Sequence, residues 1–156
     1  MRSEPVRPIV PTPPLPVEGT IELDADADRV WAAFSNVRRW SRWNRSFWRS
    51  WVVGEELELG ARIWLLFNPL KPQYLYKMPG PATIVAREEY SVTWEVDIPG
   101  LHALHRYHVE PLGDGRCRFG SWEVAEGPLY FGFRRFWLAH FRFVRDASLD
   151  GARYLG

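Results

Sequence analysis

Six strand-like runs follow one another through the middle of the chain, with no helical segment between them. They are rich in β-branched and aromatic residues, and joints that contain glycine or proline separate most of them. The runs span residues 47–53, 61–67, 82–88, 90–97, 103–112 and 116–125. Strands that follow each other without an intervening helix pair antiparallel, so this order predicts an antiparallel sheet and excludes a βαβ architecture.

Helical patterns flank this block on both sides. GTIELD at residues 19–24 alternates like a further strand, and Asp26 is a candidate cap for the helix that follows it. A second short helix is predicted over residues 37–42. After the last strand, Pro128 is well placed at the first position of a long helix, which we expect to continue to about residue 150. The predicted class is α+β, with a seven-stranded antiparallel sheet.

Two proline-rich segments lie outside these elements. Residues 1–18 form a predicted N-terminal arm in which proline recurs every three residues from Pro5 to Pro14, the period of a polyproline II helix. The arm is either a semi-rigid spacer or a ligand for an SH3-type domain, and residues 19–156 form the predicted domain. Residues 68–81 carry four prolines and are expected to be a long loop.

Composition narrows the classes of function. A chain of 156 residues suits one domain with one core, and its 20 basic and 19 acidic residues give no global field that favours nucleic acid. No apolar run approaches the ~20 residues of a membrane span. The N-terminus lacks the apolar region of a secretory signal, so we expect a cytoplasmic protein. No nucleotide-binding motif is present, and no cofactor is expected.

Large rings are the unusual component of the chain, with nine Trp, nine Phe and six Tyr. They predict either a packed core or the walls of an apolar cavity. Residues 31–51 concentrate five tryptophans and five arginines. We interpret this segment as a structural wall whose arginines stay in water, with contact to a membrane or to an anionic ligand as the alternative.

The order of elements and three local segments resemble the START-related helix-grip (SRPBCC) superfamily, in its polyketide cyclase/dehydrase-like branch. IELDADADRVWAAFSNVRRWSRWN resembles the first strand and the two short helices of that family, and YSVTWEVDIPGLHALHRYHVEPLGDGRCRF resembles its central strands. SWEVAEGPLYFGFRRFW resembles its last strand and the start of its long helix. The resemblance implies a curved sheet that grips the C-terminal helix, with a cavity between them.

The histidines of HALHRYH alternate between the two faces of a predicted strand. His105 points opposite to His102 and His108, so the three cannot converge on a metal, and no metal site is expected. If residues 113–115 form a three-residue loop, His105 lies opposite Glu123 on the next strand. A two-residue turn at Asp114 would slip the register and separate them. The apolar character of one face favours the first register.

Several side chains are predicted to line the space between the sheet and the long helix. His105, Glu123 and His140 would supply the polar groups, and His105 and Glu123 are the candidates for acid–base catalysis. The pair could equally anchor a ligand or simply orient the sheet. The apolar walls are assigned to Trp94, Tyr107, Phe119, Phe133 and Phe136.

The sequence therefore leaves three functions open. The first is a carrier or sensor that binds a small, largely apolar organic molecule in the aromatic-lined space. The second, implied by the resemblance, is a polyketide cyclase or aromatase that uses His105 and Glu123. The third is a protein that contacts a membrane or a partner, including a second copy of itself, through Phe131, Leu138 and Leu149 on the outer face of the long helix.

Overall fold

The computed structural model describes residues 15–156, apart from residues 55 and 72. Its centre is a seven-stranded antiparallel sheet with the strand order β1-β7-β6-β5-β4-β3-β2, which confirms the predicted α+β class. The strands are β1 (Val17–Leu23), β2 (Phe47–Val53), β3 (Arg62–Phe67), β4 (Met78–Glu88), β5 (Ser91–Ile98), β6 (Leu101–Gly113) and β7 (Arg116–Glu126).

The ends of two strands differ from the prediction. β1 begins at Val17, so the sheet starts inside the segment that we assigned to the arm, while residues 1–14 of that arm lie outside the described residues. β4 begins at Met78 and contains two of the four prolines expected in a loop. The connection between β3 and β4 is therefore confined to residues 68–77.

Among the described residues, five helical segments accompany the sheet. They are α1 (Ala27–Ser35), η1 (Val37–Arg39), α2 (Trp40–Trp43), α3 (Pro128–Gly132) and α4 (Arg134–Ala152). The Asp26 side chain accepts a hydrogen bond from the Asp28 backbone N–H, as expected of the predicted cap.

The prediction of one unbroken C-terminal helix is wrong. Phe133 separates α3 from α4 with φ −120° and ψ 35°, outside helical values. Gly132 before it is a weak helix former. The indole Nε1 of Trp137 also donates to the carbonyl of Leu129 at 3.2 Å, which holds the two segments together across the break.

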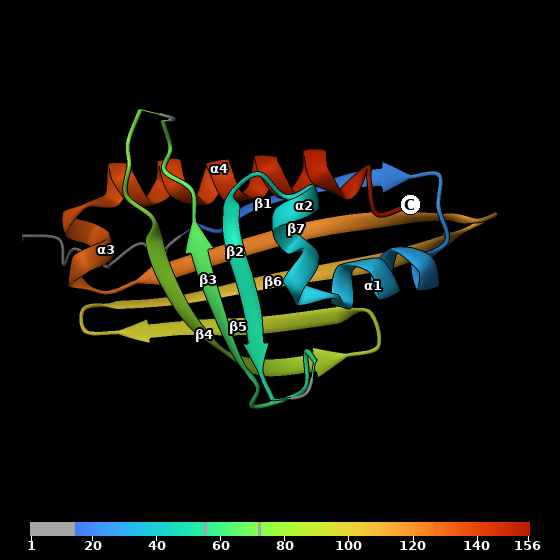
Figure 1. The fold of residues 1–156 in the computed structure, drawn as a ribbon, viewed down its shortest axis with the longest axis horizontal. Coiled ribbons are helices and arrows are strands. Elements are labelled where there is room, and N and C mark those ends of the chain that lie inside the picture. Colours follow the sequence, from blue (N-terminus) through green and yellow to red (C-terminus); the bar gives the residue numbers. More distant parts are fainter. Residues whose placement is uncertain (1–14, 55, 72) are drawn as a thin grey trace, which may run out of the picture.

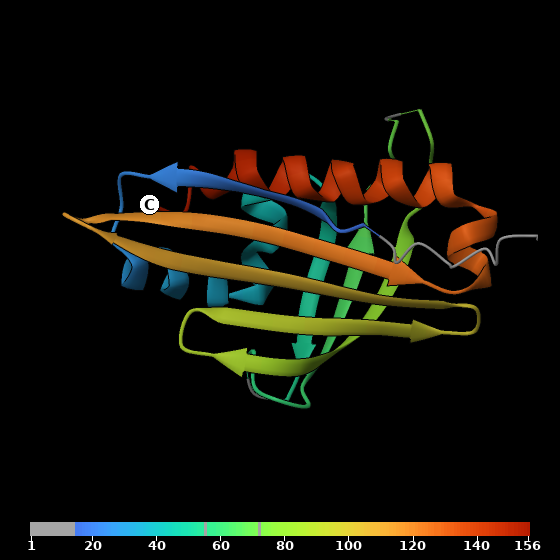
Figure 2. The same cartoon turned by 180° about the vertical axis from the view of Figure 1, so that it is seen from behind.

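The sheet is strongly curved, and α4 runs along its open side. Figure 1 shows β2, β3 and β4 crossing in front of the longer strands, and Figure 2 shows β5, β6 and β7 from behind. α4 packs on β1 and β7, and α2 contacts the C-terminal half of α4. Strands β5, β6 and β7 therefore present their inner face toward α4, as the helix-grip resemblance implies.

The register between β6 and β7 places His105 opposite Glu123, as predicted, but the turn that produces it differs. Asp114 and Gly115 form a two-residue turn with φ 53° and 70°. Gly113 pairs with Arg116, and the register shifts by one residue before Pro111 pairs with Cys117. This bulge at Leu112 restores the alignment that a two-residue turn alone would have lost.

Buried side chains form two apolar clusters along the inner face. The larger cluster lies around α1 and α2. It contains the fully buried side chains of Phe34, Trp40, Tyr107 and Phe119. The smaller one lies beside α3 and contains Val17, Leu101, Ala103, Ala125, Tyr130 and Phe141. None of the helices in the described part of the chain combines the length and apolar character required to cross a membrane.

Candidate functional site

A chain of three polar side chains lies on the inner face of β6 and β7. The imidazole Nδ1 of His105 is 3.3 Å from the carboxylate Oε2 of Glu123, and its Nε2 is 3.1 Å from the hydroxyl of Ser121. Ser121 and Glu123 are two residues apart on β7, so both point to the face that carries His105. The side chains of His105 and Glu123 are 5% and 12% exposed.

The Glu123 carboxylate is incompletely satisfied. Its Oε2 is buried and accepts no hydrogen bond from the described residues, because the contact to His105 has the distance of an ion pair without hydrogen-bond alignment. A buried carboxylate oxygen without a donor is unfavourable by a few kcal/mol. The site therefore has capacity for one more hydrogen-bond donor.

Aromatic rings cover the histidine on two sides. The ring of Trp94, the partner of His105 on β5, stacks on the imidazole with centroids 4.8 Å apart. The Tyr107 ring lies 4.4 Å from the imidazole and 5.5 Å from the ring of Phe119. The structure thus brings Trp94, His105, Tyr107, Phe119 and Glu123 together, with Tyr107 and Phe119 inside the packed core rather than on a free surface.

Tyr107 connects this face of the sheet to α4. Its hydroxyl lies 2.5 Å from the Ser148 hydroxyl, which donates in turn to the carbonyl of Val144. Since the single hydroxyl hydrogen of Ser148 is used in that bond, Tyr107 is the donor to Ser148. Burial raises the pKa of Tyr107, so the phenol remains protonated at neutral pH.

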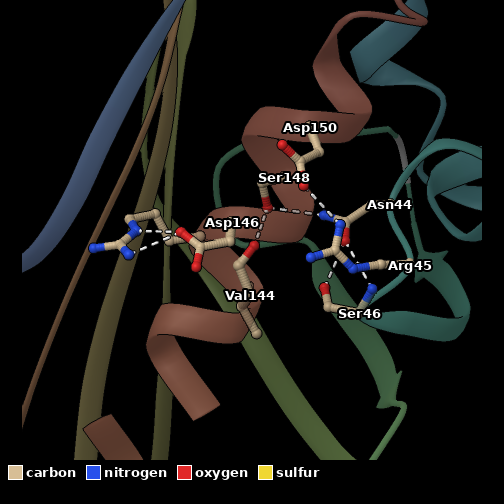
Figure 3. Close-up of polar contacts among 8 residues, drawn as sticks. Asn44, Arg45, Ser46, Val144, Asp146, Ser148 and Asp150 are labelled. Atoms are coloured by element: carbon tan, nitrogen blue, oxygen red, sulfur yellow. Dashed lines mark hydrogen bonds and ion pairs between the residues drawn. The ribbon is translucent and has the colours of Figure 1, made fainter. Parts of the chain in front are cut away.

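Asn44 continues this network to the segment after α2 (Figure 3). Its amide Nδ2 donates to the Ser148 hydroxyl at 2.8 Å, and its Oδ1 accepts from the backbone N–H and the hydroxyl of Ser46. On the surface beside it, Arg45 forms an ion pair with Asp150. These contacts fix the C-terminal half of α4 against the α2–β2 connection.

His140 extends into the region between the two apolar clusters. It is buried, and the Phe67 ring from β3 meets its imidazole edge-on at 4.8 Å. Burial lowers the pKa of His140 to about 4; the Glu123 carboxylate opposes this change and His105 adds to it. His140 is therefore neutral at physiological pH and interacts electrostatically with the His105–Glu123 pair.

Two predicted wall residues lie elsewhere. Phe133 is 63% exposed because the helix is broken at this residue, so it does not continue the inner face of α4. Phe136 is 37% exposed, with its ring parallel to that of His140 at 6.4 Å. It flanks the region beside His140 but is partly in solvent.

The outer face of the long helix is less apolar than expected. Leu138 packs against the smaller apolar cluster, and Leu149 packs against the larger one. β1 lies against Leu149, since a Cβ on Gly19 would come within 2.8 Å of its Cδ1. Of the three residues assigned to a contact surface there, Phe131 is the exposed one.

Sequence reasoning missed some residues of this site. Ser148 follows His140 and Val144 at intervals of four, so helical periodicity could have placed it on the inner face. Asn44 follows α2, and Phe67 is the last residue of β3. The approach of both residues to α4 depends on the curvature of the sheet. No local pattern marks them.

The surface pockets that described residues line lie largely on the outer side of the molecule. One of about 150 Å³ lies beside Arg62, Trp64, Glu95 and Asp97, and another opens between α2 and β2. None of the five hollows that we characterised is lined by His105, Glu123 or His140. The rings of Trp94, Tyr107 and Phe119, which were assigned to the walls of a cavity, pack against one another in the larger apolar cluster.

Comparison with solved structures shows the same fold in proteins of low sequence identity. Norcoclaurine synthase from Thalictrum flavum, in complex with dopamine and hydroxybenzaldehyde, matches with a TM-score of 0.66 at 16% identity, over 99% of this chain and 95% of that one. An aromatase/cyclase from Streptomyces sp. R1128 matches with a TM-score of 0.69 at 14% identity, over 90% and 92%. A START superfamily protein from Mycobacterium smegmatis matches with 0.64 at 15% identity, over 90% and 99%.

Sequence comparison gives the family. No curated protein matches the chain. The family model described as "Polyketide cyclase / dehydrase and lipid transport" matches residues 15–145, which is most of the chain and includes all seven strands. On this match, together with the shared helix-grip fold, the chain belongs to the polyketide cyclase/dehydrase and lipid transport family.

Proposed function

We propose that this protein binds a small, largely apolar organic molecule that carries a hydrogen-bond donor, at the Glu123 end of the inner face. The observation that carries this proposal is the buried Oε2 of Glu123, which lacks a donor among the described residues. A ligand hydroxyl or amine would supply that donor. Family membership agrees with a role in handling such molecules.

The surroundings favour an aromatic ligand with few polar groups. Phe67 would supply apolar surface beside His140, Trp94 stacks on the His105 imidazole from the core side, and neutral His140 adds one further polar contact. Tyr107 and Phe119 are held in the core, so the ligand would lie toward α3 rather than against them. Phe136 is the ring that must move, because it flanks His140 and is already partly in solvent.

Native mass spectrometry of the freshly purified protein is the direct test, followed by denaturing extraction of any bound molecule. We expect a discrete adduct with the mass of one small organic molecule. The extract should contain an aromatic alcohol, phenol or amine. The Glu123→Gln variant should bind the extracted compound at least about tenfold more weakly, since a charged acceptor is replaced by a neutral one.

Glu126→Gln is the matched control. Glu126 lies on the same strand but is exposed on the outer face, where it pairs with His102. Its replacement changes the net charge equally without touching the inner face. Equal affinity of the Glu123→Gln variant and the wild type for the extracted compound would contradict the proposed anchor.

The contacts of His105 support a second candidate function, acid–base catalysis in the same place. In the tautomer with the proton on Nδ1, beside Glu123, the imidazole would present Nε2 as the basic nitrogen, 3.1 Å from the Ser121 hydroxyl. A substrate that displaces the Ser121 hydroxyl would bring an acidic C–H to Nε2, as aldol closure of a poly-β-keto chain requires. The Ser121 side chain is buried, and its hydroxyl acts here only as the hydrogen-bond donor to Nε2 of His105.

A turnover assay with a thioester-bound poly-β-keto analogue distinguishes a ligand carrier from a cyclase. A cyclase would form an aromatic product in the wild type and lose it in His105→Gln, which keeps the approximate size of the side chain. A carrier would bind the analogue and return it unchanged. Product formation at the same rate in wild type and His105→Gln would exclude this histidine as the base.

A further inference from the structure

The tryptophans of β2 and β3 do not belong to the core. Trp31 and Trp40 are buried, as expected of a structural wall, whereas Trp48 is 45% exposed and Trp51 is 37% exposed. Trp64, the cross-strand partner of Trp51, is also 37% exposed. We infer that this tryptophan surface docks the protein onto an anionic lipid bilayer.

The surface combines exposed rings with basic side chains that form no ion pair with another described residue. We define it by three rings and the four basic side chains around them: Trp48, Trp51, Trp64, Arg38, Arg49, Arg62 and Lys77. An open groove of about 480 Å³ lined by Arg38, Trp48, Arg49 and Trp51 joins part of this set. The ion pairs found among the described residues use other arginines, namely Arg45, Arg116, Arg118 and Arg145.

The way in which the rings are covered indicates what they can bind. Arg49 lies over the Trp48 ring at 4.9 Å and Lys77 at 5.5 Å, so cations already occupy this ring. Trp51 and Trp64 stack on each other at 6.3 Å with 16° between their planes. Each of these rings therefore already has a face in contact with a cation or with another ring, which leaves less free aromatic face for the stacking of nucleic-acid bases.

An anionic bilayer matches both features. Tryptophan is enriched at the boundary between lipid headgroups and acyl chains, where its apolar ring and indole N–H are both accommodated. Basic side chains beside it are attracted to the negative surface of phosphatidylserine- or phosphatidylglycerol-containing membranes. A second copy of this chain is a poorer partner, because its own tryptophan surface would bring like charges together.

Acidic side chains mark one border of the surface. Glu95 and Asp97 on β5 line the hollow that also contains Arg62 and Trp64. Glu95 is paired with His102, on the far side from β2. The inferred contact is therefore centred on β2 and the connection from η1, at the free edge of the sheet, rather than on the whole outer face.

Co-sedimentation of the full chain with vesicles tests this inference. We expect binding to phosphatidylcholine vesicles that contain phosphatidylglycerol, and little binding to phosphatidylcholine alone. The Trp48→Ser/Trp51→Ser variant should lose most of the binding. The Arg38→Gln/Arg49→Gln variant leaves the core untouched and should bind at least about fivefold more weakly for each charge removed.

Trp122→Ser and Arg106→Gln are the matched controls. Arg106 covers the Trp122 ring at 5.3 Å on the outer face of β6 and β7, so this pair has the same chemistry at a different place. Both controls should bind vesicles like the wild type. Equal loss in the controls, equal binding to neutral vesicles, or binding of single-stranded polyuridine in place of vesicles would each overturn the inference.

Discussion

His105 faces Glu123 across β6 and β7, with the imidazole Nδ1 3.3 Å from the carboxylate Oε2 in a mostly buried position. Burying such a pair costs desolvation energy that its mutual attraction does not always recover, and removal of one partner leaves the other charge uncompensated. The pair therefore has consequences for stability that differ from those of a surface ion pair.

We predict that His105→Leu lowers the free energy of unfolding by about 3 kcal/mol, because it isolates the Glu123 carboxylate in an apolar environment. The double variant His105→Leu/Glu123→Leu should recover to within about 1 kcal/mol of the wild type. Urea denaturation followed by tryptophan fluorescence measures both. A double variant as unstable as the single one would show that the loss arises from packing and not from the isolated charge.

His140 should make the protein sensitive to acid. Its folded-state pKa of about 4 lies below the ordinary value of 6.5, so the unfolded chain binds a proton more readily between these values. The resulting stability is present above pH 6.5 and is lost as the pH falls toward 4. At pH 5 the loss from this residue is about 2 kcal/mol.

The difference between wild type and His140→Gln isolates this effect from that of the carboxylates, which titrate in both proteins. Unfolding by urea at pH 7 and at pH 5 would show a smaller decrease in the variant. Glu123 and His105 both act on His140, so the measurement should be repeated in the Glu123→Gln background. Parallel pH dependence in wild type and His140→Gln would contradict the predicted burial of a neutral imidazole.

His102, on the opposite face of β6, should act with the opposite sign. Its hydrogen bond to Glu95 raises its pKa, so the folded state binds the proton more tightly than the unfolded chain. The resulting stability is complete below pH 6.5 and is lost as the pH rises through the elevated folded-state pKa. Because the side chain is 37% exposed, we expect less than about 1 kcal/mol. Comparison of His102→Gln with wild type at pH 6 and pH 9 would reveal a difference that shrinks with rising pH.

The sequence predicted the inner-face register better than the turn that creates it. The predicted pairing of His105 with Glu123 also implies that Tyr107 lies opposite Ser121 and Val109 opposite Phe119, and both pairs are present in the structure. The two-residue turn is compensated by a bulge at Leu112. One extra residue leaves the alternation intact on either side, so side-chain patterns cannot distinguish this arrangement from a three-residue loop.

Elements whose positions depend on the curvature of the sheet were the least predictable. The apolar periodicity of residues 129–147 continues through Phe133, so it gave no sign that α3 ends and α4 begins there. Trp40 and Trp48 both belong to the aromatic segment 31–51, yet one is fully buried and the other is 45% exposed. Composition identified the rings, but the path of β2 along the free edge of the sheet decides which of them reach solvent.

The crossing of α4 with the end of α2 depends on Gly151. A Cβ built on this residue would overlap the backbone carbonyl oxygen of Trp43, where neither group is a flexible side chain. Gly151→Ala must therefore separate the two elements and strain the contacts of Asn44 with Ser148. We expect the free energy of unfolding to fall by about 3 kcal/mol, measured by urea denaturation.

Gly132→Ala provides the control for the general effect of alanine on helix formation. A Cβ at Gly132 meets nothing within 4 Å of the described residues, and this glycine ends α3 without positive φ. Alanine there should stabilise the protein by about 0.5 kcal/mol, since it reduces the conformational freedom of the unfolded chain. Opposite signs for the two substitutions would assign the loss at Gly151 to the close helix crossing, whereas a stable Gly151→Ala variant would show that α4 can move away from Trp43 at little cost.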